Sequence, residues 1–311
     1  MISRRNIRIK VMQLLYMIES SGDKNLYKDP IAQLQKNVGK TTELLVYLIH
    51  YLTEVVRYVE TDARHRASKN LPTYEDLHVN TKIAGNIILW QLLENESLVH
   101  AIKNDNTNSK VDSTTVRKIY IQLAETAEYK NYINEPTRDR KADKEILAFI
   151  FNSLILPNEL FEEQTDELFN NWDDDAEMMQ QLVNTFIQKP TNTTDKLLTD
   201  ETWSFGKLLL QTAIEKNNFT LELIKPKLKN WDSERIAVLD MILMQMGVCE
   251  LLYFETIPTK VTINEYIDLA KSYSTPQSGQ FVNGILDNIH KELIAEGKIN
   301  KVDFKKKGRW G

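Results

Sequence analysis

Few of the side chains that commonly perform catalysis or hold metals stand at spacings that would let them do so. The five histidines are scattered along the chain, with no HExxH pattern and no paired ligand spacing. The single cysteine, Cys249, can form neither an intramolecular disulfide nor a cysteine-based zinc site. Asn264 and Glu265 could be drawn as a helper and a general base, but no nucleophile is implied nearby, and we expect them to cap and orient the start of a helix. We therefore predict a protein that is not an enzyme and that has no catalytic residues, metal or cofactor.

The chemistry that the chain does offer is phosphate binding at its start, where Arg4, Arg5 and Arg8 gather. The spacing of apolar residues predicts a helix over residues 4–18, with Ser3 as its N-cap. Cations at a helix N-terminus oppose the helix dipole by about 0.3–1 kcal/mol each when they are exposed. A polyanionic partner would compensate for that repulsion, and the alternative is a solvated charged face. Because the whole chain has a net charge of -5, nucleic-acid binding must come from a local patch of this kind.

A second informative stretch, residues 256–289, reads as two helices joined by a tight turn at residues 274–279. Phe281 follows this turn directly, where its ring could stack on an RNA base or pack in the core. Gly284 interrupts the second helix, and we expect it to allow the close approach of another backbone.

The composition favours an all-α protein. Apolar residues make up 42% of the chain, while Gly (10) and Pro (8) are scarce, which favours long helices over a turn-rich β architecture. A short helix is expected at residues 31–38 and a separate apolar helix at 43–60, with further helices up to residue 188. No apolar run is long enough to cross a membrane, and the N-terminus has no signal-peptide pattern. We expect a cytoplasmic protein that does not contact membranes.

Residues 260–287 resemble the signature of the NusB transcription antitermination family. The resemblance rests on Lys260-Val261, Ile263-Asn264-Glu265, LAKSY at 269–273 and FVNGILD at 281–287. At the N-terminus, Arg4, Arg5 and Arg8, followed by Gln13-x-Leu15-Tyr16, resemble the arginine-rich first helix of this family. The resemblance covers about residues 3–20 and 198–304, which is under half of the chain.

The resemblance implies a fold and a domain organisation. The fold would be an all-α, NusB-like helical bundle with an additional inserted helical region. Residues 1–34 would be the N-terminal arginine-rich helix of the NusB-like domain, and residues 35–195 an inserted helical region of unknown role. Residues 196–311 would be the C-terminal NusB-like helical domain with a basic tail.

The resemblance also implies a function. The protein would bind single-stranded boxA-type RNA together with NusE, a small-subunit ribosomal protein, in the transcription elongation complex. This binding would prevent premature termination of rRNA transcription. Two residues match the family's NusE-binding surface by position, namely Tyr16 and Asp240. The candidate RNA contacts are Arg4, Arg5, Arg8, Lys260, Lys271, Gln280 and Phe281.

Two other readings remain open. The chain could be a helical protein-interaction scaffold without RNA binding, with the inserted region as its working surface. It could also be an RNA-binding accessory to an rRNA methyltransferase, because some of these enzymes carry a similar helical domain. Such an enzyme would need an α/β domain with a glycine-rich cofactor loop and a catalytic cysteine, and the sequence contains neither.

Overall fold

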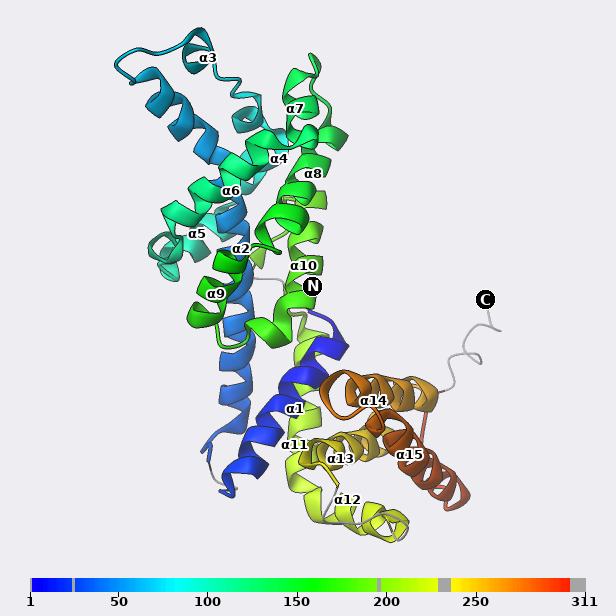
Figure 1. Ribbon diagram of the computed structural model, residues 1–311. Coiled ribbons are helices and arrows are strands. Elements are labelled where there is room, and N and C mark those ends of the chain that lie inside the picture. The colour runs from blue at the N-terminus through cyan, green and yellow to red at the C-terminus, as the bar shows by residue number, and fades with distance from the viewer. Residues whose placement is uncertain (1, 24–25, 195–196, 229–235, 303–311) are drawn as a thin grey trace, which may run out of the picture. The chain divides into compact units, whose positions relative to one another are not determined.

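The computed structural model describes residues 2–23, 26–194, 197–228 and 236–302. All secondary structure within these ranges is helical and no strand occurs in them, which confirms the predicted all-α class (Figure 1). The basic tail at residues 305–309 lies outside the described residues.

The chain divides into two compact units. Unit 1 comprises Met1 and Val38–Leu197, and unit 2 comprises Ile2–Asn37 and Leu198–Gly311. Unit 2 contains α1 (Arg4–Ser21), the first turns of α2 (Pro30–Ala67), α11 (Asp200–Glu215), α12 (Asn217–Ile224), η5 (Lys225–Leu228), α13 (Val238–Tyr253), α14 (Thr259–Tyr273) and α15 (Ser278–Ala295). Unit 1 contains the rest of α2, α3 (Tyr74–Leu77), η1 (Lys82–Gly85), α4 (Ile87–Leu93), α5 (Glu96–Asn104), η2 (Thr107–Lys110), α6 (Ser113–Glu125), α7 (Ala127–Asn134), α8 (Arg140–Phe149), the π-helical η3 (Ile150–Ile155), α9 (Glu159–Leu168) and α10 (Trp172–Gln188).

Helix α2 is one continuous helix of 38 residues, whereas the sequence predicted two helices separated at residues 39–42. Gly39 lies in this stretch and costs about 1 kcal/mol against alanine in a helix interior. Two features beside it offset that cost. Val38 is buried, and the Thr41 hydroxyl donates a 2.9 Å hydrogen bond to the buried Asp175 carboxylate of α10. Tertiary contacts therefore keep this stretch helical although its residues have low helix propensity.

The core of unit 1 is rich in aromatic rings. Tyr47 and Tyr51 of α2 lie fully buried against Phe161 of α9, with ring centroids 6.4 and 4.7 Å away. Phe169 and Trp172 extend the cluster, at 5.1 Å from Tyr47 and 6.1 Å from Phe161. Burial raises the pKa of Tyr47 to about 12, so this phenol stays neutral. Tyr47 and Tyr51 are thus core residues of unit 1.

Unit 2 is built around α13, which is buried on nearly all sides. Helices α1, α11, α12, α14 and α15 all pack against it. One close approach to α13 involves Gly247, where an added Cβ would come within 2.9 Å of Leu286 of α15. Gly284, by contrast, is exposed and a Cβ there would meet nothing within 4 Å. The expected close approach at Gly284 is therefore wrong within unit 2, and the close approaches occur at other glycines, Gly247 among them.

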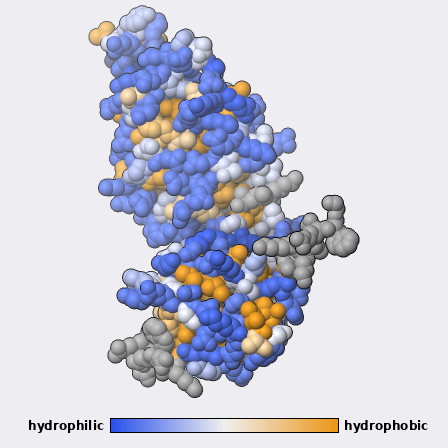
Figure 2. Space-filling view, turned by 90° about the vertical axis from the view of Figure 1, so that its right-hand side faces the viewer, coloured by the Kyte–Doolittle hydropathy of each residue, from blue (hydrophilic) through white to orange (hydrophobic). Residues whose placement is uncertain are grey.

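On the face that Figure 2 shows, apolar residues form small separate patches among polar ones. None of the helices in the described part combines the length and the apolar character that crossing a bilayer requires.

Candidate nucleic-acid interface

The candidate interface begins at the first turn of α1 in unit 2. Ser3 caps this helix reciprocally with Asn6: the Asn6 backbone amide donates to the Ser3 hydroxyl at 3.2 Å, and the Ser3 amide donates to the Asn6 side chain at 2.9 Å. The cap fixes the positions of Arg4 and Arg5, which open the helix. Helix α1 has no acidic residue in its first turn, so the carboxylates that balance these arginines come from other helices.

Arg4 is paired with Glu201 in the first turn of α11. Its Nη2 atom lies 2.5 Å from Glu201 Oε1, and its Cζ atom lies 5.7 Å from the centroid of the Phe205 ring. The Arg4 side chain is 37% exposed and that of Glu201 is 78% exposed. This guanidinium is therefore held at the surface of unit 2, within reach of a ligand.

Arg5 is paired with Glu265 of α14. Its Nη1 atom lies 3.7 Å from Glu265 Oε2, and the same oxygen accepts a hydrogen bond from Arg8 Nη1 at 3.3 Å. Glu265 is the seventh residue of α14, and the N-cap of that helix is Pro258. The expectation that Glu265 caps the helix start is therefore wrong, because its carboxylate faces two arginines of α1.

Arg8 lies inside unit 2, and the structure contradicts its predicted contact with RNA phosphates. The residue is 3% exposed. Its Nε and Nη2 atoms donate to Glu250 of α13 at 2.9 and 2.8 Å, a two-point pair. Burial alone would lower the pKa of Arg8, but the hydrogen bond to Glu250 and the electrostatic effects of Tyr266, Glu250 and Glu265 together outweigh burial and raise the pKa above its ordinary value. The guanidinium is therefore a charged anchor that joins α1 to α13 and α14.

The Glu250 carboxylate accepts four hydrogen bonds inside the unit. Besides the two from Arg8, Thr262 Oγ1 donates at 2.8 Å and the Tyr266 hydroxyl at 3.1 Å. The Arg8 guanidinium also lies 5.0 Å from the centroid of the Phe205 ring. Sequence reasoning missed Glu250 as an anchor. A usable signal existed, because a glutamate in the middle of an apolar helix needs a buried partner.

The turn between α14 and α15 spans residues 274–277, close to the predicted connection. Phe281 follows it but is only 6% exposed. The ring therefore packs in the core of unit 2, and its predicted stacking on RNA is wrong for this structure. Gln280 beside it is exposed, as are Lys260 and Lys271 of α14. Lys271 lies 3.5 Å from Asp268 one turn away, and Lys260 has no ion pair within the described residues.

The two residues predicted to contact NusE differ in their exposure. Tyr16, near the end of α1, is 45% exposed and can reach a partner. Asp240, in the first turn of α13, is buried, and its Oδ2 atom accepts a hydrogen bond from Ser278 Oγ at 2.7 Å. This carboxylate joins α13 to the start of α15, so the structure contradicts the predicted contact of Asp240 with NusE.

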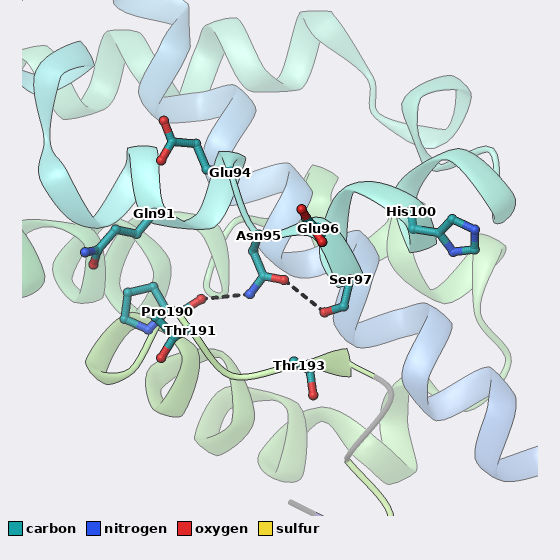
Figure 3. Close-up of a pocket in the computed structure, with 9 residues that line it drawn as sticks. All are labelled: Gln91, Glu94, Asn95, Glu96, Ser97, His100, Pro190, Thr191 and Thr193. Atoms are coloured by element: carbon teal, nitrogen blue, oxygen red, sulfur yellow. Dashed lines mark hydrogen bonds between the residues drawn. The ribbon is translucent and has the colours of Figure 1, made fainter.

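Unit 1 holds an open hollow of about 770 Å³ beside residues 190–193 (Figure 3). Asn95 lines this hollow, and its Nδ2 atom donates hydrogen bonds to the backbone oxygens of Pro190 and Asn192 at 2.8 and 2.7 Å. Ser97 Oγ donates to Asn95 Oδ1 at 2.9 Å, and the His100 ring points away from this pair. No activated nucleophile results from this geometry. The lining residues are Gln91, Glu94, Asn95, Glu96, Ser97, His100, Pro190, Thr191 and Thr193.

The residues that the structure describes offer no metal-binding site. Among the residues that the structure describes, no group of three or more His, Cys, Asp or Glu side chains could hold a metal ion. Burial raises the pKa of the Cys249 thiol to about 12, partly opposed by a hydrogen bond with Thr212. This cysteine is therefore a neutral core residue of unit 2.

Comparison with known proteins identifies the relatives of this chain. Residues 158–291 match the model of the NusB family. Transcription antitermination protein NusB of Salinibacter ruber is 41% identical over 100 residues, covering 32% of this chain and 62% of the relative. The protein of the same name from Chloroherpeton thalassium is 46% identical over 72 residues, covering 23% and 34%. That from Thermodesulfovibrio yellowstonii is 39% identical over 95 residues, covering 30% and 63%.

The extent of these matches is limited. Each covers less than two thirds of the relative's own length. The family match begins at residue 158, inside the predicted insertion of residues 35–195, and α1 lies outside it. No solved structure matches the chain.

Proposed function

Since the chain carries a NusB family domain at residues 158–291, we propose that it is an RNA-binding transcription antitermination factor. It binds single-stranded boxA-type RNA together with the ribosomal protein NusE in the transcription elongation complex. This binding prevents premature termination of rRNA transcription. The three relatives above are all named transcription antitermination protein NusB, and that shared name supports the proposal.

The proposed RNA binding rests on the pair of surface arginines at the start of α1, Arg4 and Arg5. Arg4 and Arg5 are partly exposed on adjacent positions of a capped helix, where they can each meet a phosphate. The distribution of charge along the chain also supports unit 2 as the RNA-binding unit. Residues 38–197 carry 17 basic and 26 acidic side chains, a net charge of -9, whereas the remaining residues carry 22 and 18, a net charge of +4. A polyanion is attracted to unit 2 and repelled by unit 1.

The proposed contacts follow from exposure. Arg4 and Arg5 bind phosphates, while the exposed side chains of Lys260, Lys271 and Gln280 supply further polar contacts. Arg8 and Phe281 hold the fold of unit 2 and do not touch RNA. Tyr16 supplies a contact to NusE.

The domain division belongs to the same proposal. Residues 1–34 and 196–311 form the NusB-like domain, and residues 35–195 form an insertion of unknown role. The boundaries between the two compact units, at 37/38 and 197/198, support this division.

The direct test is equilibrium binding of the full chain to a boxA-type RNA oligonucleotide and to a scrambled oligonucleotide, with and without NusE. We expect tighter binding to the boxA-type RNA and a further gain when NusE is present. Equal affinity for both RNAs would remove the sequence preference from the proposal. Absence of binding to either RNA, even with NusE, would favour the scaffold reading instead.

A further inference from the structure

The arginines at the start of α1 are charge-balanced in the free protein. Arg4, Arg5 and Arg8 face three carboxylates from three different helices, which are those of Glu201 in α11, Glu250 in α13 and Glu265 in α14. The first turn of α1 supplies none of them, because it holds no acidic residue. A phosphate that approaches Arg4 or Arg5 therefore meets a guanidinium that already has an anionic partner.

The pair between Arg4 and Glu201 is exposed and easily exchanged. Its N–O distance is 2.5 Å, but the Glu201 side chain is 78% exposed. An exposed ion pair of this kind shifts an equilibrium by only about 1.4-fold to 5-fold. Glu201 is therefore placed to compete with an incoming phosphate without excluding it.

The pair between Arg5 and Glu265 is weaker still. Its N–O distance is 3.7 Å, and the Glu265 oxygen that faces Arg5 also accepts the 3.3 Å hydrogen bond from Arg8. The Glu265 side chain is 28% exposed, so its carboxylate is less accessible to solvent than that of Glu201. When a phosphate pairs with Arg5, the carboxylate of Glu265 remains hydrogen-bonded to Arg8.

We propose that Glu201 and Glu265 are intramolecular competitors of RNA phosphate at Arg4 and Arg5. This inference rests on the proposed RNA-binding function and adds a mechanism that sets its affinity. Because the carboxylates compete with the phosphate and not with the bases, they weaken the binding of every single-stranded RNA by the same factor. Removing them tightens binding and leaves the preference for one RNA sequence over another unchanged.

The test uses Glu201→Gln, which removes the charge and keeps the shape of the side chain. The matched control is Glu215→Gln, because Glu215 is exposed at the other end of α11. The two positions are separated by about 21 Å along the helix, more than two Debye lengths at physiological ionic strength, where that length is about 8 Å. Both variants change the net charge of the chain equally. Affinities of the full chain for boxA-type and scrambled oligonucleotides are measured by fluorescence anisotropy.

We expect Glu201→Gln to bind both RNAs about 1.4-fold to 5-fold more tightly than the wild type, and Glu215→Gln to leave both affinities unchanged. Glu265→Gln should also tighten binding, and the two changes should combine multiplicatively because they release different arginines.

Three other outcomes overturn the inference. If the wild type binds RNA and Glu201→Gln is no tighter than Glu215→Gln, the competition is wrong while the proposed function stands. If the two oligonucleotides respond by different factors, Glu201 acts on base recognition and not on phosphate. If neither the wild type nor any variant binds RNA, the inference falls together with the proposed function. Binding that is seen only in Glu201→Gln would support the competition directly.

Discussion

Arg8 and Glu250 lie 242 residues apart in the chain and form a two-point ion pair inside unit 2, with N–O distances of 2.9 and 2.8 Å. Neither side chain reaches solvent to a meaningful extent, at 4% and 0% exposure. The pair joins α1 to α13 and so fixes the helix that presents Arg4 and Arg5. One arginine of the N-terminal cluster thus positions the other two.

Breaking this pair should destabilise unit 2 strongly. In Glu250→Gln, the buried Arg8 guanidinium loses its main counter-ion, and we expect a loss of about 3–5 kcal/mol in the free energy of unfolding. Urea denaturation measures this loss. Glu201→Gln, at an exposed pair, is the control and should change stability by less than about 0.5 kcal/mol. A Glu250→Gln protein as stable as the wild type would show that the Arg8 guanidinium reaches solvent.

Two glycines of unit 2 should respond to alanine in opposite directions. Gly284→Ala places a methyl group in open space on an exposed helical position, and we expect a gain of about 0.5–1 kcal/mol because alanine is the better helix former. Gly247→Ala places a methyl group within 2.9 Å of Leu286, and we expect a loss of about 1–3 kcal/mol from overpacking. Thermal unfolding of both variants checks the pair. Destabilisation by Gly284→Ala would mean that another backbone does approach this position.

The stability of unit 1 should depend on pH through Asp112, which caps α6. Its carboxylate accepts hydrogen bonds from the Thr115 hydroxyl and amide at 2.7 and 2.8 Å, which lower the pKa of Asp112 to about 2. A lowered folded pKa means that the contribution is present above the unfolded value of about 3.9 and is lost as the pH falls towards 2. We expect Asp112→Ala to cost about 1 kcal/mol at neutral pH.

Unfolding in urea at pH 7, 4 and 2 tests this expectation. The difference in the free energy of unfolding between the wild type and Asp112→Ala should be smaller at pH 4 than at pH 7, and smallest at pH 2. Asp112→Asn, which caps without titrating, serves as the control and should differ from Asp112→Ala by the same amount at each pH. A constant difference between the wild type and Asp112→Ala down to pH 2 would contradict the assignment.

The thiol of Cys249 should be inert in the folded protein. With its pKa raised to about 12 by burial, the thiolate fraction at pH 8 is about a thousandfold below that of an ordinary thiol of pKa 8.5. A chromogenic disulfide reagent should therefore label the native chain far more slowly than the chain in concentrated urea. Equal rates in both conditions would place this cysteine at an accessible surface.

Local patterns were enough to predict the helices at residues 4–18 and on either side of residues 274–279, but not the environment of the charged residues of unit 2. The turn formers at residues 274–279 marked the break between α14 and α15, because these residues act through their own backbone. The burial of Arg8 could not be predicted in the same way, since its partner Glu250 stands on a helix distant in sequence. Asp240 is a similar case, because its partner Ser278 begins another helix.

The prediction of two helices at residues 31–60 failed for a related reason. Gly39 and the threonines after it are weak helix formers, and the local sequence favoured a break there. The hydrogen bond from Thr41 to Asp175 in α10 supports the helix across this stretch. Such support depends on a tertiary contact, which periodicity alone does not reveal.

If unit 2 binds RNA phosphates through Arg4 and Arg5, as we propose, RNA affinity should depend less on salt in Arg4→Ala/Arg5→Ala, and this salt dependence is the most direct test. The control is Lys291→Ala/Lys298→Ala, which removes two exposed positive charges elsewhere on unit 2. We expect the arginine variant to bind a boxA-type oligonucleotide more weakly, with a salt slope smaller by about 1.4, because each phosphate that is no longer neutralised lowers the slope by about 0.7. The control should keep the wild-type slope. Equal slopes in the wild type and the arginine variant would contradict the claim.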